Sequence, residues 1–96
     1  MFVIFGKYRK PIEEVDRVLP AHKEFLDKYY AKGVFVCSGA MKPREGGVII
    51  CNAKSRDEVD VIMSEDPFFI EQVTDYSIIE FTPTKACDAM HCFLVG

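Results

Sequence analysis

The chain has 96 residues, of which 49% are hydrophobic and 28% are charged, and its formal net charge is −3. This length and composition fit one globular domain and exclude a second domain or a largely disordered chain. The negative net charge and the lack of an extended basic stretch argue against nucleic-acid binding, which depends on Lys and Arg to neutralise phosphates.

The N-terminal segment and the cysteines predict a soluble cytoplasmic protein with free thiols. Positive charges follow the apolar run at residues 2–5, whereas a secretory signal places them before a longer run. No apolar stretch reaches the roughly 18–20 residues that span a bilayer. Because the cytosol is reducing, disulfides are not expected. The cysteines in question are Cys37, Cys51, Cys87 and Cys92.

The first third of the chain predicts a short strand followed by a helix. Residues 2–5 (FVIF) are rich in β-forming side chains and are followed by Gly6. Residues 12–32 carry apolar side chains at i, i+3 and i+4 spacing, which is typical of an amphipathic helix, and Gly33 provides its stop. Because Pro20 lacks the N–H that a helix interior uses, we expect a short leading turn and a main helix that starts there.

The rest of the chain predicts three further strands and a second helix. Residues 40–47 contain one Pro and two Gly and indicate a loop. Ser55 and Glu58 form a capping-box pattern that starts the second helix, and Pro67 ends it. A short helical turn is expected at 68–72. The three strands are expected at residues 34–38, 48–52 and 74–82.

This order of elements predicts a ferredoxin-like β-α-β-β-α-β fold of the α+β class, in which two helices cover one face of a four-stranded antiparallel sheet. A sheet with one face in water normally alternates apolar and polar side chains. The runs FVIF, VFVC and VIIC do not alternate. We therefore expect a homodimer in which a second copy covers the open face.

Two ionisable residues interrupt the apolar stripes of the two helices. His22 lies seven positions after Val15, and Asp66 lies seven positions after Val59. A carboxylate beside an imidazole fixes its tautomer and leaves the other ring nitrogen free to move a proton. Taken singly, His22 also fits a core histidine bonded to a backbone carbonyl, and Asp66 before Pro67 fits a helix N-cap. The residues alone therefore leave open a functional pair, a buried structural pair and two unrelated structural side chains.

Several short motifs are shared with a known family. They are Pro20-Ala21-His22, Ser38-Gly39, Gly47-Val48-Ile49-Ile50, Asp66-Pro67-Phe68 and Tyr76-Ser77-Ile78-Ile79-Glu80-Phe81. With these motifs, about residues 1–83 resemble the YCII-related family. The resemblance implies a dimeric ferredoxin-like α+β barrel with a His–Asp pair in a cleft, and these roles fall to His22 and Asp66.

The resemblance also suggests a kind of chemistry. One relative is a chlorohydroxyhydroquinone dehydrochlorinase, which implies a lyase or isomerase that needs no cofactor and moves a proton on a small molecule. Many members have Arg three positions before the histidine, where this chain has Leu19, so an anion-binding role for that arginine does not carry over. The alternative is a non-catalytic small-molecule-binding or stress-response module with the same pocket. From their places near strand ends and beside Asp66, the expected lining residues are Tyr8, Ser38, Phe68 and Tyr76.

Residues 84–96 lie beyond the resemblance and hold three candidate zinc ligands, Cys87, His91 and Cys92. On a helix, Cys87 and His91 would share a face at i, i+4 spacing, as zinc ligands do, but such a site would need a further ligand such as Cys37 or Cys51. We expect no bound metal, and instead an apolar tail that docks on its own domain or on a partner subunit.

Overall fold

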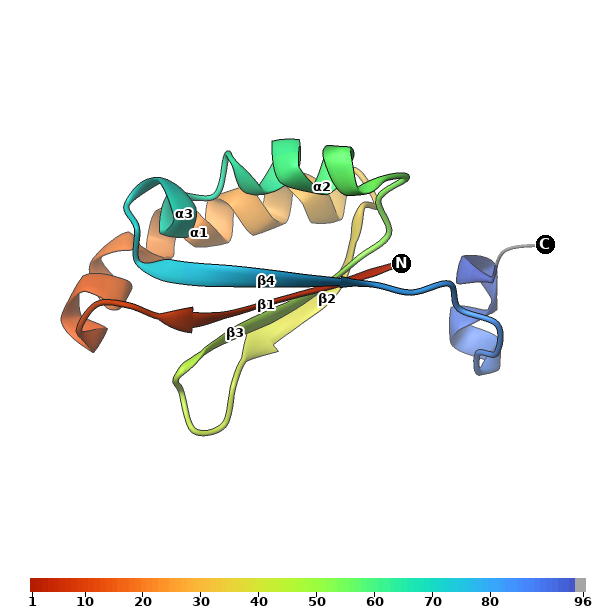
Figure 1. The fold of residues 1–96 in the computed structure, drawn as a ribbon, viewed down its shortest axis with the longest axis horizontal. Helices are drawn as coiled ribbons and strands as arrows, with labels where there is room; N and C mark the ends of the chain where they lie inside the picture. The colour runs from red at the N-terminus through yellow and green to blue at the C-terminus, as the bar shows by residue number, and fades with distance from the viewer. Residues whose placement is uncertain (95–96) are drawn as a thin grey trace.

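A computed structural model describes residues 1–94, which form a sheet with helices on one face (Figure 1). All neighbouring strands pair antiparallel, in the order β2-β3-β1-β4. This order places two crossover connections on the same side, so the predicted ferredoxin-like α+β class is confirmed. The strands are β1 (Phe2–Tyr8), β2 (Phe35–Ala40), β3 (Gly46–Cys51) and β4 (Thr74–Glu80).

The helices bury a shared apolar core against the sheet. They are α1 (Ile12–Ala31), α2 (Arg56–Met63) and the short α3 (Pro67–Ile70). Phe25 and Tyr29 of α1 and Val59 and Ile62 of α2 reach the same buried cluster as Phe2 of β1. Each helix therefore buries the stripe that its sequence periodicity predicts.

The prediction that a new helix starts at Pro20 is wrong, because α1 continues through it. Pro20 and Asp16, whose carbonyl loses its donor, both belong to the exposed side of the helix. Water can bond that carbonyl, so the break that a proline usually causes is not required here.

Glycines explain why β3 begins earlier than expected. Residues 40–47 were expected to be a loop, but Gly46 and Gly47 belong to β3. A Cβ at Gly46 would lie 1.8 Å from the carbonyl oxygen of Gly6, so only glycine permits this approach to β1. The strand β2 likewise extends to Ala40, whereas β4 ends at Glu80 rather than at residue 82.

The two faces of the sheet differ in what covers them. Phe2 and Ile4 of β1 are buried against the helices, while Val3 and Phe5 point to the other side and are half-buried. Figure 1 shows α1, α2 and α3 on one side of the sheet only. We call the other side the open face; by strand register its apolar side chains are Val3, Phe5, Val48, Ile50 and Ile79, and Ser77 lies opposite Phe5.

The C-terminal segment forms a 3₁₀ helix, η1 (Asp88–Phe93), beyond the end of β4 (Figure 1). None of the residues of η1 is buried, so docking of this tail stays a prediction. Within residues 1–94 no disulfide forms and no helix is long and apolar enough to cross a membrane.

Candidate functional site

His22 and Asp66 meet in the buried layer between α1 and α3. His22 Nδ1 lies 2.7 Å from Asp66 Oδ1, although the residues are 44 positions apart. Asp66 is 0% exposed and His22 is 9% exposed. The expected contact is thus present, and α1 and the N-terminus of α3 supply its two halves. Its catalytic role stays a prediction.

The Asp66 carboxylate accepts three hydrogen bonds. Besides His22, it accepts the backbone N–H of Phe68 at 2.9 Å and the hydroxyl of Tyr76. The Phe68 contact makes Asp66 the N-cap of α3, with Pro67 at the first helical position. The N-cap and the His–Asp interpretations therefore hold together, because one carboxylate serves both. A buried carboxylate is costly without partners, and three donors satisfy this one.

Tyr76 reaches Asp66 because β1 has a glycine, Gly6, beneath the Tyr76 ring. Gly6 lies opposite Tyr76 in the β1–β4 pairing, and a Cβ at Gly6 would lie 2.8 Å from the Tyr76 ring. The ring crosses β1 at this point, so its hydroxyl can donate to Asp66. Burial, and secondarily the Asp66 charge, raise the pKa of Tyr76 far above its ordinary value.

The ring of His22 is held on a second side by Phe68. The two rings stack with centroids 3.9 Å apart and an angle of 7° between their planes. Because the carboxylate accepts from Nδ1, the neutral ring carries its lone pair on Nε2. That nitrogen is the one that can accept a proton.

A cavity of about 350 Å³ lies between α1 and the sheet, and His22 forms part of its wall. This volume is at the small end of ligand pockets, which fits a molecule about the size of one substituted ring. Much of the wall is apolar and comes from α1, β3 and α3. The apolar lining residues on the helix side of the sheet include Leu19, Leu26, Ile49 and Phe68.

The four residues expected to line the cleft, Tyr8, Ser38, Phe68 and Tyr76, all line this cavity. Their polar groups are not equally available. The Tyr76 hydroxyl is bonded to Asp66, and Ser38 Oγ lies 2.5 Å from the hydroxyl of Tyr30. Tyr76 therefore supports the His–Asp pair from behind instead of facing a ligand with a free hydroxyl.

Three charged lining residues were missed by the sequence analysis: Asp16, Lys23 and Arg44. Arg44 Nη2 lies 2.7 Å from Asp16 Oδ1, so the β2–β3 hairpin contacts α1 at the cavity. Asp16 and Lys23 resemble ordinary solvated helix residues in the sequence, and Arg44 lies in what was expected to be a plain loop. No sequence signal marks them.

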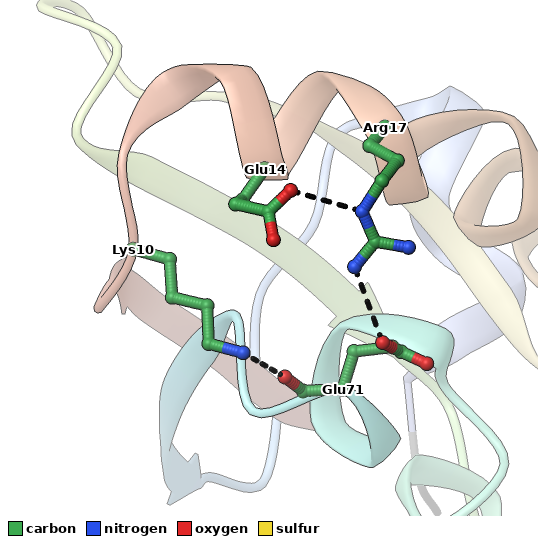
Figure 2. A network of polar contacts seen from close by, with 4 residues as sticks. All are labelled: Lys10, Glu14, Arg17 and Glu71. Carbon is green, nitrogen blue, oxygen red and sulfur yellow. Dashed lines mark hydrogen bonds and ion pairs between the residues drawn. The ribbon is translucent and has the colours of Figure 1, made fainter.

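A surface network fixes α3 near the start of α1 (Figure 2). Arg17 contacts Glu14 at 2.9 Å and Glu71 at 3.2 Å, and Lys10 donates to the Glu71 carbonyl at 2.8 Å. Glu71 is the C-cap of α3, whose N-cap is Asp66. Exposed pairs contribute little singly, but a network of them can restrain a helix of four residues.

The tail does not assemble a ligand set in the described part of the chain. Across residues 1–94, no three or more His, Cys, Asp or Glu side chains are grouped so that they could hold a metal ion. Cys87 caps a 3₁₀ helix, in which residues three apart share a face, so the i, i+4 arrangement of Cys87 and His91 expected for an α-helix is absent there.

Comparisons with known proteins place this geometry among relatives. The family model of the YCII-related domain matches residues 1–82. A solved structure of 5-chloro-2-hydroxyhydroquinone dehydrochlorinase from Burkholderia phenoliruptrix AC1100, in complex with 2,5-dihydroxybenzoquinone, superposes with a TM-score of 0.71 and 19% identity. The alignment covers 85% of this chain and 94% of that chain, which supports the fold. Comparison with curated protein sequences gives no significant match.

Proposed function

Because the chain belongs to the YCII-related domain family, we propose that it is a small-molecule enzyme of the lyase or isomerase type that uses His22 and Asp66 for proton transfer and needs no cofactor. One observation carries the proposal. Asp66 holds Nδ1 of His22 at 2.7 Å, so the imidazole at the cavity wall has Nε2 for chemistry. The similarity to a dehydrochlorinase fits this class of reaction.

In the proposed reaction, His22 Nε2 removes a proton from the substrate as a general base. For the dehydrochlorination of a chlorinated hydroquinone, one hydroxyl loses its proton and becomes a carbonyl while the ring carbon that bears chlorine gains a proton. His22 then removes the proton of a second hydroxyl, the O–H electrons form the second carbonyl, and the ring electrons expel chloride with the electron pair of the C–Cl bond, so that HCl is lost overall. Asp66 stabilises the imidazolium that forms, and the Phe68 N–H and the Tyr76 hydroxyl keep that carboxylate in place. A substrate bound against the apolar wall displaces water from beside His22, which strengthens these interactions.

The proposed enzyme is a cytoplasmic homodimer in which a second copy covers the open face. Support comes from the apolar side chains there: Ile79 is 54% exposed, and Phe81 at the end of β4 is 44% exposed. Exposed apolar side chains gathered on one sheet face are typical of a protein–protein interface. A mass of one chain by light scattering at micromolar concentration would contradict the dimer.

The reaction is tested with 5-chloro-2-hydroxyhydroquinone and a panel of halogenated hydroquinones, following released chloride. We expect turnover by the parent protein and a loss of about 100-fold or more in His22→Gln, since general acid–base catalysis contributes roughly 10²–10⁴. Equal rates in both proteins contradict a catalytic His22. Binding of 2,5-dihydroxybenzoquinone without turnover of any panel member would instead support the non-catalytic binding module.

A further inference from the structure

We propose that Arg44 and Lys23 bind an acidic group of the substrate, so that the cavity beside His22 accepts a ring-sized organic anion. This rests on the proposed function for the location of the site, and it adds the chemical class of the ligand.

The charged side chains around the cavity have a net positive charge, whereas the chain as a whole is negative. The protein as a whole carries −3, yet the cavity wall contains Lys23 and Arg44 against the single carboxylate of Asp16. Asp66 lies behind His22 and its charge is compensated by three hydrogen bonds. A small cleft with an excess of one charge and apolar walls attracts ligands of the opposite charge.

The backbone of the hairpin holds Arg44 at the cavity, while its side chain can exchange Asp16 for another anion. The hairpin that carries it is fixed by the Met41 N–H on the Gly46 carbonyl and the Tyr8 N–H on the Glu45 carbonyl, both at 2.9 Å. The ion pair with Asp16 is exposed, with 40% and 55% of the two side chains accessible, so it contributes little to stability. A ligand carboxylate can therefore replace Asp16 and be held by the planar guanidinium through two hydrogen bonds.

Lys23 supplies a second cation directly after His22 on α1. It belongs to the cavity wall, and none of the ion pairs formed within residues 1–94 includes it. Its ammonium is therefore available to a ligand that occupies the space beside Leu19 and Leu26. An anion held here lies next to His22, the proposed base.

The competing explanation is that Arg44 and Asp16 only join the hairpin to α1 and keep the cavity closed at that side. The two explanations predict opposite signs for one substitution. If Arg44 anchors an anion, Asp16 competes with that anion, so Asp16→Asn strengthens binding. If the pair is only a bridge, Asp16→Asn and Arg44→Gln remove the same contact and weaken binding alike.

The experiment compares benzoate and benzamide, which have nearly the same size and differ in charge, by NMR titration of the His22 ring signals. We expect the parent protein to bind benzoate at least about tenfold more tightly than benzamide. Arg44→Gln and Lys23→Gln should each weaken benzoate about tenfold, and Asp16→Asn should tighten it several-fold. Benzamide binding should stay unchanged in all of these variants.

Lys54→Gln is the matched control, because it removes the same charge from an exposed residue outside the cavity and should leave benzoate binding unchanged. Equal affinity of the parent for the two probes, or weaker benzoate binding in Asp16→Asn, overturns the proposal. A benzoate preference in a protein that turns over no halogenated hydroquinone supports the anion site and contradicts only the proposed reaction. Turnover of a halogenated hydroquinone by a protein that does not prefer benzoate supports the proposed reaction and contradicts the anion site.

Discussion

Both faces of the sheet carry apolar side chains, but the buried His22–Asp66 pair and the cavity beside it lie on the helix-covered face. On that face, Asp66 is buried with three donors, and a cavity lies beside its partner His22. On the open face, Val3 and Phe5 of β1 are half-buried, and Figure 1 shows none of α1, α2 and α3 on that side. The difference indicates that the helices supply the hydrogen-bond donors that a buried carboxylate needs, whereas the open face is suited to association with another protein surface. Substitutions on the helix-covered face should therefore lower stability, and substitutions on the open face should change assembly.

Removing the carboxylate at the centre of the covered face should have the largest effect. Asp66→Ala removes the N-cap of α3 and leaves His22, the Phe68 N–H and the Tyr76 hydroxyl without their shared acceptor. We expect a loss of about 3–5 kcal/mol in the free energy of unfolding, the range for a broken buried pair. For a domain of this size, the thermal midpoint should fall by well over about 10 °C. A fall of less than about 5 °C, measured by circular dichroism, would contradict the importance of this cluster.

Tyr76→Phe should have the next largest effect, and the effect should depend on pH. A hydrogen bond to a charged group contributes about 1.5–3 kcal/mol, so the variant should be less stable by about that amount at neutral pH. The pKa of Tyr76 is raised in the folded protein above its ordinary value of 10.0. A raised pKa means that the contribution is fully present below pH 10 and is lost as the pH rises above it.

Urea unfolding of the parent and of Tyr76→Phe at pH 7, 9 and 11 measures this dependence. The stability difference between the two proteins should be constant from pH 7 to 9 and smaller at pH 11. A difference that grows at pH 11 would mean that the hydroxyl does not donate to Asp66 in solution.

On the open face, a single charge should change assembly more than folding. Ile79 is 54% exposed in one copy, so Ile79→Asp should cost that copy little stability while it places a charge in the proposed dimer interface. Val61→Asp on α2, where Val61 is 64% exposed, is the matched control outside that face. We expect the mass from light scattering to fall from two chains to one in Ile79→Asp and to stay at two in Val61→Asp. The same mass for both variants would count against the open face as the interface.

The sequence was sufficient for the class of fold and for the central pair, for a physical reason. His22 and Asp66 each interrupt a regular apolar stripe, and a fault in a periodic pattern is visible without coordinates. Asp66 was assigned either to a cap or to a pair, and the geometry shows that its Oδ1 serves both, while Oδ2 accepts from Tyr76.

Other features could not be predicted because they depend on contacts between distant segments. Arg44 lies in the β2–β3 hairpin and contacts Asp16 of α1, 28 positions earlier in the chain. Nothing local to Arg44 indicates that contact. The unbroken helix at Pro20 depends likewise on which side of α1 faces water, a property of the folded chain. Local propensity therefore predicted elements, and tertiary contact decided their ends and their charged partners.

The central claim is that His22 is held for chemistry rather than for stability, and the thermal midpoint of His22→Ala tests it most directly. In this variant Asp66 still accepts hydrogen bonds from the Phe68 N–H and the Tyr76 hydroxyl. Water from the cavity can take the place of the His22 ring as the third donor. We therefore expect a loss of about 1 kcal/mol or less, since replacing a functional residue is often nearly neutral for stability. The midpoint should then fall by at most about 4–8 °C. A fall of well over about 10 °C, equal to that of Asp66→Ala, would show that the pair is structural and would contradict the assignment of this site.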